Sequence, residues 1–358
     1  MAVRYSPDVE VVEADEAATA EALTATMKTI SAATLKDEGH PLRSVHAKSH
    51  ALLDAELAIA AGLPPELAQG LFASAGTYQA VLRISTSPGD LLDDHVSTPR
   101  GLAIKVFGVP GEQLSGNAAD TTQDFLLVDA PAFLAPTPKA FAGTVKLLAA
   151  TADKAEGLKR AFATVVRGVE SVIEAAGGES GKLVALGGHK LTNPLGEIYY
   201  SQVPIRYGDY IAKVAVVPVG ELAKLKDAPV DLDGHKNGLR MAIGQHFADA
   251  GGEWEVRVQL CTDLAAMPVE DAAAVWPEDV SPYVTVARLT AASQPSWSLD
   301  QVAAIDDGVS FSPWHGLTAH RPLGGVNRVR KPVYDALAGE RSTRLGCPFT
   351  EGAHHAAG

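Results

Sequence analysis

Apolar and polar positions alternate along several stretches of the chain, and this spacing predicts strands. In Glu253–Leu260 the apolar residues Trp254, Val256, Val258 and Leu260 occupy every second position. Similar alternation predicts further strands at Gln79–Thr86, Gly101–Gly108, Thr122–Asp129, Glu197–Gly208, Tyr210–Val219 and Tyr283–Thr290. Gly208–Asp209 separates two of these runs and is a strong hairpin signal.

Other stretches have helical spacing or composition. They predict an exposed N-terminal helix at Glu13–Thr34 and helices at His46–Ala61, Pro65–Ser74, Leu158–Ile173 and Asn327–Arg341. Because the strands follow one another in runs and do not alternate with helices, the fold class is α+β. Long antiparallel strands must hide their edges, and closure into a barrel achieves this. We expect a helical arm at residues 1–40 and a single barrel domain at 41–358.

Composition narrows the range of partners. The chain has 358 residues and a formal net charge of −13, which argues against nucleic acid because phosphate binding requires basic surfaces. Two cysteines, Cys261 and Cys347, cannot form a disulfide framework and suit a reducing compartment. We find no signal-peptide pattern and no apolar run long enough for a membrane span, so a cytoplasmic location is expected.

Histidines and arginines are the first candidates for chemistry. His46 and His50 are four residues apart and could hold a metal on one face of a helix, although a structural or surface histidine is the plain alternative. His315 and His320, in a loop rich in proline and glycine, could likewise bind metal or satisfy loop backbone groups. Arg83 lies in the middle of a predicted strand, where a buried guanidinium needs an acidic partner.

Arg330 and Tyr334 are four residues apart, on one face of the last predicted helix. A guanidinium beside a phenol favours the phenolate, which is a hard anionic ligand able to hold ferric iron. The alternative is an amphipathic surface helix with a basic rim. Pro332 lies between the two residues and predicts that the helix starts or kinks there.

Six motifs in order resemble the haem catalase superfamily, in particular its small catalase-like branch. They are Arg43-x2-His46-Ala47-Lys48, Arg83-Ile84-Ser85-Thr86, Pro99–Lys105, Asp124–Phe133, Phe311–Leu317 and Arg330-x3-Tyr334. The resemblance covers about residues 43–344. It implies an eight-stranded antiparallel barrel with inserted and flanking helices, one bound haem b (iron protoporphyrin IX) and assembly into a homo-oligomer.

The resemblance also assigns roles to individual residues. His46 matches the distal acid–base histidine, Tyr334 the proximal iron ligand, and Arg330 the arginine that keeps the phenol ionised. Thr121 stands where the family has a distal asparagine, and its hydroxyl lacks the fixed donors of an amide. Further cofactor-binding positions implied by the match are Arg43, Val45, Arg83, Ser85, Phe133 and Arg344.

The function implied is a haem-dependent oxidoreductase of the catalase or peroxidase type that acts on peroxide. Because the distal amide is replaced, rearrangement of a lipid or other organic hydroperoxide is an alternative. A second alternative is a haem carrier or sensor, which would need Tyr334 and the arginines but not His46. The third is a metal hydrolase that uses His46 and His50.

Overall fold

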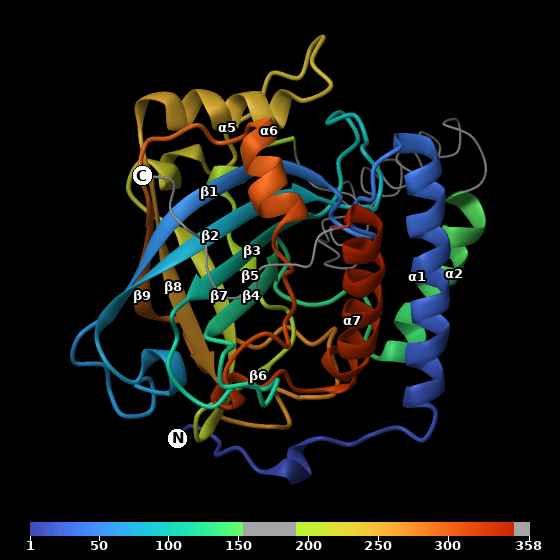
Figure 1. Ribbon diagram of the computed structural model, residues 1–358. Coiled ribbons are helices and arrows are strands. Elements are labelled where there is room, and N and C mark those ends of the chain that lie inside the picture. The colour runs from blue at the N-terminus through green and yellow to red at the C-terminus, as the bar shows by residue number, and fades with distance from the viewer. Residues whose placement is uncertain (153–190, 347–358) are drawn as a thin grey trace, which may run out of the picture.

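The computed structural model describes residues 1–152 and 191–346 (Figure 1). The predicted helix at Leu158–Ile173 lies outside the described residues. Within them, the strands are β1 (Lys48–Ile59), β2 (Gly76–Thr86), β3 (Arg100–Phe107), β4 (Thr122–Val128), β5 (Tyr199–Tyr200), β6 (Ile205–Tyr207), β7 (Tyr210–Pro218), β8 (Gly252–Leu260) and β9 (Val284–Ala291).

The strands form a closed antiparallel barrel. The hydrogen-bonded order runs β5-β4-β3-β2-β1-β9-β8-β7, and β5 also pairs with β7, so eight strands close the ring. β6 is an additional strand that pairs with β7 across Gly208–Asp209, as the hairpin signal predicted. The predicted α+β class with an eight-stranded antiparallel barrel is therefore confirmed. The main apolar core lies within this ring and includes Leu53, Leu57, Leu82, Ile104, Val214, Val256, Val258 and Leu289.

Two helices predicted near the start of the barrel are wrong. The segment predicted as a helix from His46 to Ala61 forms β1, which pairs with both β2 and β9. In the second half of β1 the exposed Asp54 and Glu56 alternate with buried Ala55 and Leu57, so the barrel uses a period of two. The segment Pro65–Ser74 contains only the short 3₁₀ turn Gly70–Phe72.

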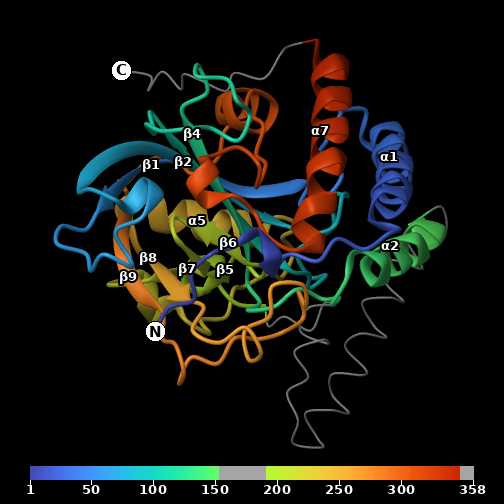
Figure 2. The same ribbon diagram turned by 90° about the horizontal axis from the view of Figure 1, so that it is seen from below.

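Helices cover one side and one end of the barrel. They are α1 (Glu16–Glu38), α2 (Pro138–Ala152), α5 (Gly238–Asp249), α6 (Leu299–Gln301) and α7 (Gly325–Leu345). Both views show α1 and α7 side by side next to the barrel, while α5 lies across its end (Figures 1 and 2). Leu23 and Met27 of α1 share an apolar cluster with Val329 and Val333 of α7, so the N-terminal helix packs on the last one. No helix in the two described ranges is long and apolar enough to cross a membrane.

The start of α7 is fixed by one arginine and three glutamates. Arg328 donates hydrogen bonds to Glu10 (2.7 Å), Glu16 (2.8 Å) and Glu270 (2.9 Å). Its side chain is only 12% exposed. Two of the same carboxylates also accept from the main-chain N–H groups of Gly324 and Gly325, which begin the helix. The N-terminal arm and the first turn of α7 are therefore held by a shared ionic cluster.

We predict that Arg328→Met lowers the free energy of unfolding by about 3 kcal/mol, because Glu16 and Glu270 lose this cation and Glu10 keeps only Arg321. Chemical denaturation measures this loss. Lys331→Met is the matched control, since Lys331 and Asp335 form an exposed pair (50% and 52%) and its loss should cost less than about 0.5 kcal/mol. Equal losses in the two variants would contradict the importance of the cluster.

Candidate functional site

Three arginines from distant parts of the chain meet beside the barrel wall. Arg43 precedes β1, Arg83 lies in the middle of β2, and Arg341 comes from α7. Arg83 Nε lies 2.5 Å from a carboxylate oxygen of Asp306, and Arg43 Nε lies 3.8 Å from the same oxygen. Arg341 Nη1 donates to the main-chain carbonyl of Asp306 at 2.6 Å. Arg83 is only 2% exposed. A buried strand arginine was expected to have an acidic partner, and that partner is Asp306.

Burial of several like charges shifts the pKa values in this cluster. Desolvation, together with Arg341 and Arg83, holds the pKa of Arg43 well below its ordinary value. Desolvation also lowers the pKa of Arg341 to about 10. Burial alone would raise the pKa of the Asp306 carboxyl, but Arg83 and Arg43 hold it below its ordinary value. Asp306 therefore remains an anion that partly neutralises the arginines.

His46 lies just before β1, with its ring against the backbone of β3. Its backbone has a φ of 51°, which is uncommon for a residue with a side chain. A Cβ on Gly101 would lie 2.7 Å from His46 Nδ1, so only glycine leaves room for the ring at this position. His46 Nε2 lies 3.2 Å from the hydroxyl of Ser87. The other ring nitrogen, Nδ1, is buried and makes no hydrogen bond of good geometry, although the backbone of Ser85 is close enough to act on the ring.

The surroundings of His46 favour the neutral imidazole. Desolvation lowers its pKa to about 4, and the positive charges of Arg83 and Arg330 act in the same direction. Asp129 opposes this shift but does not cancel it. At neutral pH the ring can therefore accept a proton, as a general base must.

On α7, Arg330 and Tyr334 interact as their spacing predicts. Arg330 Nη2 donates to the Tyr334 hydroxyl at 3.1 Å, and Arg330 Nη1 donates to the side-chain oxygen of Asn327 at 3.2 Å. The helix begins at Gly325 and continues through Pro332 to Leu345, so it does not start at the proline. The positive charge of Arg330 also helps to lower the pKa of His46, so these two residues are near enough to interact electrostatically.

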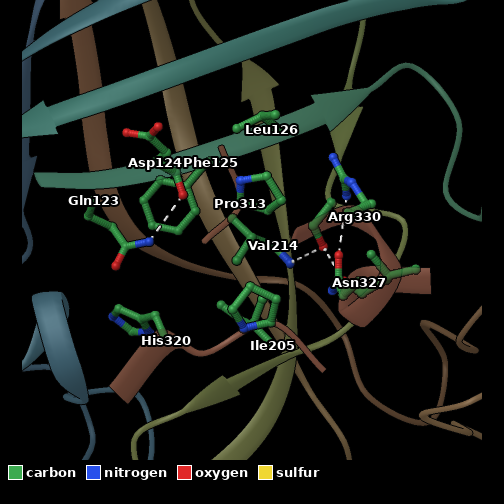
Figure 3. A pocket seen from close by; sticks show the side chains of 13 residues that line it. Gln123, Asp124, Phe125, Leu126, Ile205, Val214, Pro313, His320, Asn327 and Arg330 are labelled. Atoms are coloured by element: carbon green, nitrogen blue, oxygen red, sulfur yellow. Dashed lines mark hydrogen bonds between the residues drawn. The ribbon is translucent and has the colours of Figure 1, made fainter. Parts of the chain in front are cut away.

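A small cavity lies beside Arg330 (Figure 3). Its volume is about 30 Å³, and its lining includes Asp124, His320 and Asn327. This is room for a few water molecules at most, whereas ligand pockets usually measure ~300–1,000 Å³. A porphyrin does not fit into this cavity unless the side chains that line it move.

Three further residues implied by the catalase resemblance lie around these groups. Val45, next to His46, packs on the apolar cluster between α1, α2 and α7. Ser85 is buried in β2 and pairs with Gly101, under the His46 ring. Phe133 contacts Phe141 of α2, with 4.9 Å between ring centroids, and packs near Val326 at the start of α7.

Two of the implied residues are not brought to the site. In the β3–β4 pair Gly101 lies opposite Val128, while Phe107 lies opposite Thr122. Thr121 is therefore at the far end of the pair from His46, because it lies seven residues before Val128, or about 23 Å at ~3.3 Å per residue. Arg344 is exposed and pairs with Glu340 on its own helix. The buried arginine near the end of α7 is Arg341, seven residues after Tyr334, which the sequence analysis missed.

The histidines proposed as metal ligands have other surroundings. His50 is fully buried in β1 and lies 2.9 Å from the Thr86 hydroxyl. His315 Nδ1 is 3.3 Å from Asp124, and His320 Nε2 accepts the N–H of Leu71 at 2.9 Å. Across residues 1–152 and 191–346, no three His, Cys, Asp or Glu side chains are grouped to hold a metal ion. The structure thus gives no support to the metal hydrolase.

Comparison with solved structures identifies the fold. The structure matches a fungal catalase with a TM-score of 0.60 at 16% sequence identity, over 88% of this chain and 61% of that one. Catalase A from Saccharomyces cerevisiae gives 0.58 at 16% identity, over 88% and 63%. A bacterial catalase gives 0.59 at 15% identity, over 96% and 63%.

The protein therefore has the catalase fold, as the sequence motifs indicated. It spans less than two thirds of the length of each of these catalases. No protein-family model and no curated protein matches the sequence. At this level of identity the likeness defines the fold, and function must be argued from the site.

We predict that the imidazole of His46 titrates with a pKa of about 4, measured by NMR on histidine-labelled protein. Arg83→Gln should raise this pKa because a nearby positive charge is removed, whereas Arg288→Gln, an exposed arginine on β9, should leave it unchanged. The unfolded chain binds this proton at about pH 6.5, so its contribution to stability is lost as the pH falls from 6.5 towards 4. Titration of His46 near 6.5 would contradict the environment described.

Proposed function

We propose that the protein is a haem b-dependent oxidoreductase that acts on peroxide. The observation that carries this proposal is the pairing of Tyr334 with Arg330 on the helix that also brings Arg341 to Arg43 and Arg83. Helix α7 thus carries the Tyr334 phenol beside the Arg330 guanidinium, and Arg341 of the arginine cluster lies two turns after Tyr334. A phenolate for ferric iron and guanidinium groups for carboxylates are the partners that a haem requires.

The donor groups of the site fit this cofactor. Tyr334, whose hydroxyl accepts a hydrogen bond from Arg330, would bind the iron, and the arginine cluster would bind the propionates. His46 would supply a buried, neutral imidazole that can accept a proton. The narrow cavity beside Arg330 means that binding must displace side chains between α7 and the barrel.

When bound, a haem supplies the iron at which the peroxide O–O bond is broken and which stores the oxidising equivalents. The protein supplies the proton movements. The neutral ring of His46 would accept the proton from one peroxide oxygen and donate it to the other, so that water or an alcohol leaves. Its low pKa means that the ring is unprotonated at neutral pH, although it also makes the ring a weaker base than an exposed imidazole.

The substrate class follows from the groups around His46. The hydroxyl of Ser87 lies at 3.2 Å, and the segment before β4 brings no side chain there, because Thr121 is at the other end of the strand. A hydroxyl gives a peroxide less rigid orientation than an amide does. This observation favours an organic hydroperoxide, converted by rearrangement or by peroxidase chemistry, as the second candidate beside hydrogen peroxide.

We predict that His46→Ala in haem-loaded protein lowers kcat/KM for peroxide by about 10²–10⁴-fold, the usual contribution of an acid–base group. Haem content, measured by absorbance, should stay unchanged. His235→Ala, at an exposed position, is the matched control. Unchanged turnover with haem retained would overturn the catalytic proposal in favour of a haem carrier.

Product analysis separates the two substrates. Release of oxygen from hydrogen peroxide indicates catalase activity, whereas conversion of a fatty acid hydroperoxide without oxygen release indicates rearrangement. Each reaction should show the same dependence on His46.

A further inference from the structure

Asp306 occupies the centre of the arginine cluster, and it is supplied by an unusual element. It lies in the π-helical turn Val302–Asp307, which follows the short helix α6 and packs beside β1 and β2 (Figure 1). π-Helical turns are rare and are frequently found at functional sites. Such a turn holds one residue more than an α-helical turn, so a local shift in hydrogen bonding can move its side chains.

Asp306 holds the guanidinium edges that a ligand would need. One of its oxygens is 2.5 Å from Arg83 Nε and 3.8 Å from Arg43 Nε, and the other accepts from the Ser49 hydroxyl at 2.6 Å. The remaining edges mostly face the protein's own main chain. Arg43 Nη2 donates to the carbonyls of Asp306 and Val309, and Arg83 Nη2 to that of Ala47. An incoming carboxylate must therefore compete with Asp306 for Arg83 and Arg43.

The arginine cluster contains a hydrogen-bond donor that Asp306 does not satisfy. Arg43 Nε is buried and makes no hydrogen bond, since 3.8 Å is beyond hydrogen-bond distance. Among Arg43, Arg83, Arg341, Asp306 and Asp307, positive charge exceeds negative charge by one. A buried guanidinium donor without an acceptor is costly, so the arrangement favours a further anion.

We propose that Asp306 is an internal competitor: it holds Arg83 and Arg43 in the ligand-free protein, and the carboxylate of a ligand replaces it on binding. The inference rests on the proposed function insofar as the ligand is haem and the carboxylate is a propionate. It assigns Asp306 a role in setting affinity: loading exchanges one carboxylate for another, and the ligand must displace a residue already bound.

The test is a titration of the apoprotein with haemin, followed by absorbance. Asp306→Asn should bind haemin at least about tenfold tighter than the wild type, because a hydrogen-bonded competing charge is removed. Asp300→Asn, an exposed aspartate nearby in the chain, controls for net charge and should change affinity by less than about twofold. Haemin dimethyl ester has no free carboxylate, so it should bind the wild type and Asp306→Asn with equal affinity.

If Asp306→Asn does not fold, Ser49→Ala provides a second test. Ser49→Ala leaves the carboxylate in place but removes the hydrogen bond that holds it, and should tighten haemin binding by a smaller factor. Equal or weaker haemin binding by a folded Asp306→Asn protein would overturn the proposal, because Asp306 would then be a fixed support for the arginines.

A measurement without haem separates this inference from the proposed function. The melting temperature of each apoprotein is compared in sodium propionate and in sodium chloride at equal ionic strength. Propionate should raise the melting temperature of Asp306→Asn and leave the wild type nearly unchanged. No response in Asp306→Asn would overturn the exchange even if haemin binds. A response without haemin binding in any variant would support the exchange and refute the haem function.

Discussion

Buried positive charge between α7 and the barrel is the constraint on which the site depends. Arg43, Arg83, Arg330 and Arg341 all lie in this region, and charges out of water must be matched or they destabilise the fold. The protein provides Asp306 and Asp307 for one group, and Asn327 and the Tyr334 phenol for Arg330. Burial lowers the pKa of His46, and the charges of Arg83 and Arg330 act in the same direction, so the ring is neutral at neutral pH. The cofactor proposed above would supply further carboxylates to the arginine cluster.

The sequence predicts most of the barrel, because strands with one buried face carry a period-two signal. β8 shows this most clearly, with buried Trp254, Val256 and Val258. β1 was mistaken for a helix because Ala, Leu and Glu favour helices locally, whereas pairing with β2 and β9 decides its conformation. The alternation of Asp54 and Glu56 with apolar residues was the available signal. Helix α5 gave no clear signal, and closure through the two-residue β5 depends on contacts that no local pattern reveals.

The site is predictable where residues share an element and less so where distant segments meet. Arg330 and Tyr334 were found from helical spacing. Arg341 could have been found in the same way, since seven residues are two helical turns, yet Arg344 was chosen by analogy and is exposed. The catalase resemblance implies a distal role for Thr121, but strand register places it away from His46. Asp306 could not be anticipated, because only the folded chain brings it to Arg43 and Arg83, more than two hundred residues away.

The central proposal is that Tyr334, whose hydroxyl accepts from Arg330, would bind the iron of a haem. The most direct measurement is the absorption spectrum of the haemin-reconstituted protein, wild type against Tyr334→Phe, with Tyr210→Phe as a control outside the site. The account predicts a phenolate-to-iron charge-transfer band in the wild type and in Tyr210→Phe, and its loss in Tyr334→Phe. Identical spectra in all three proteins, or failure of the wild type to bind haemin, would contradict the account.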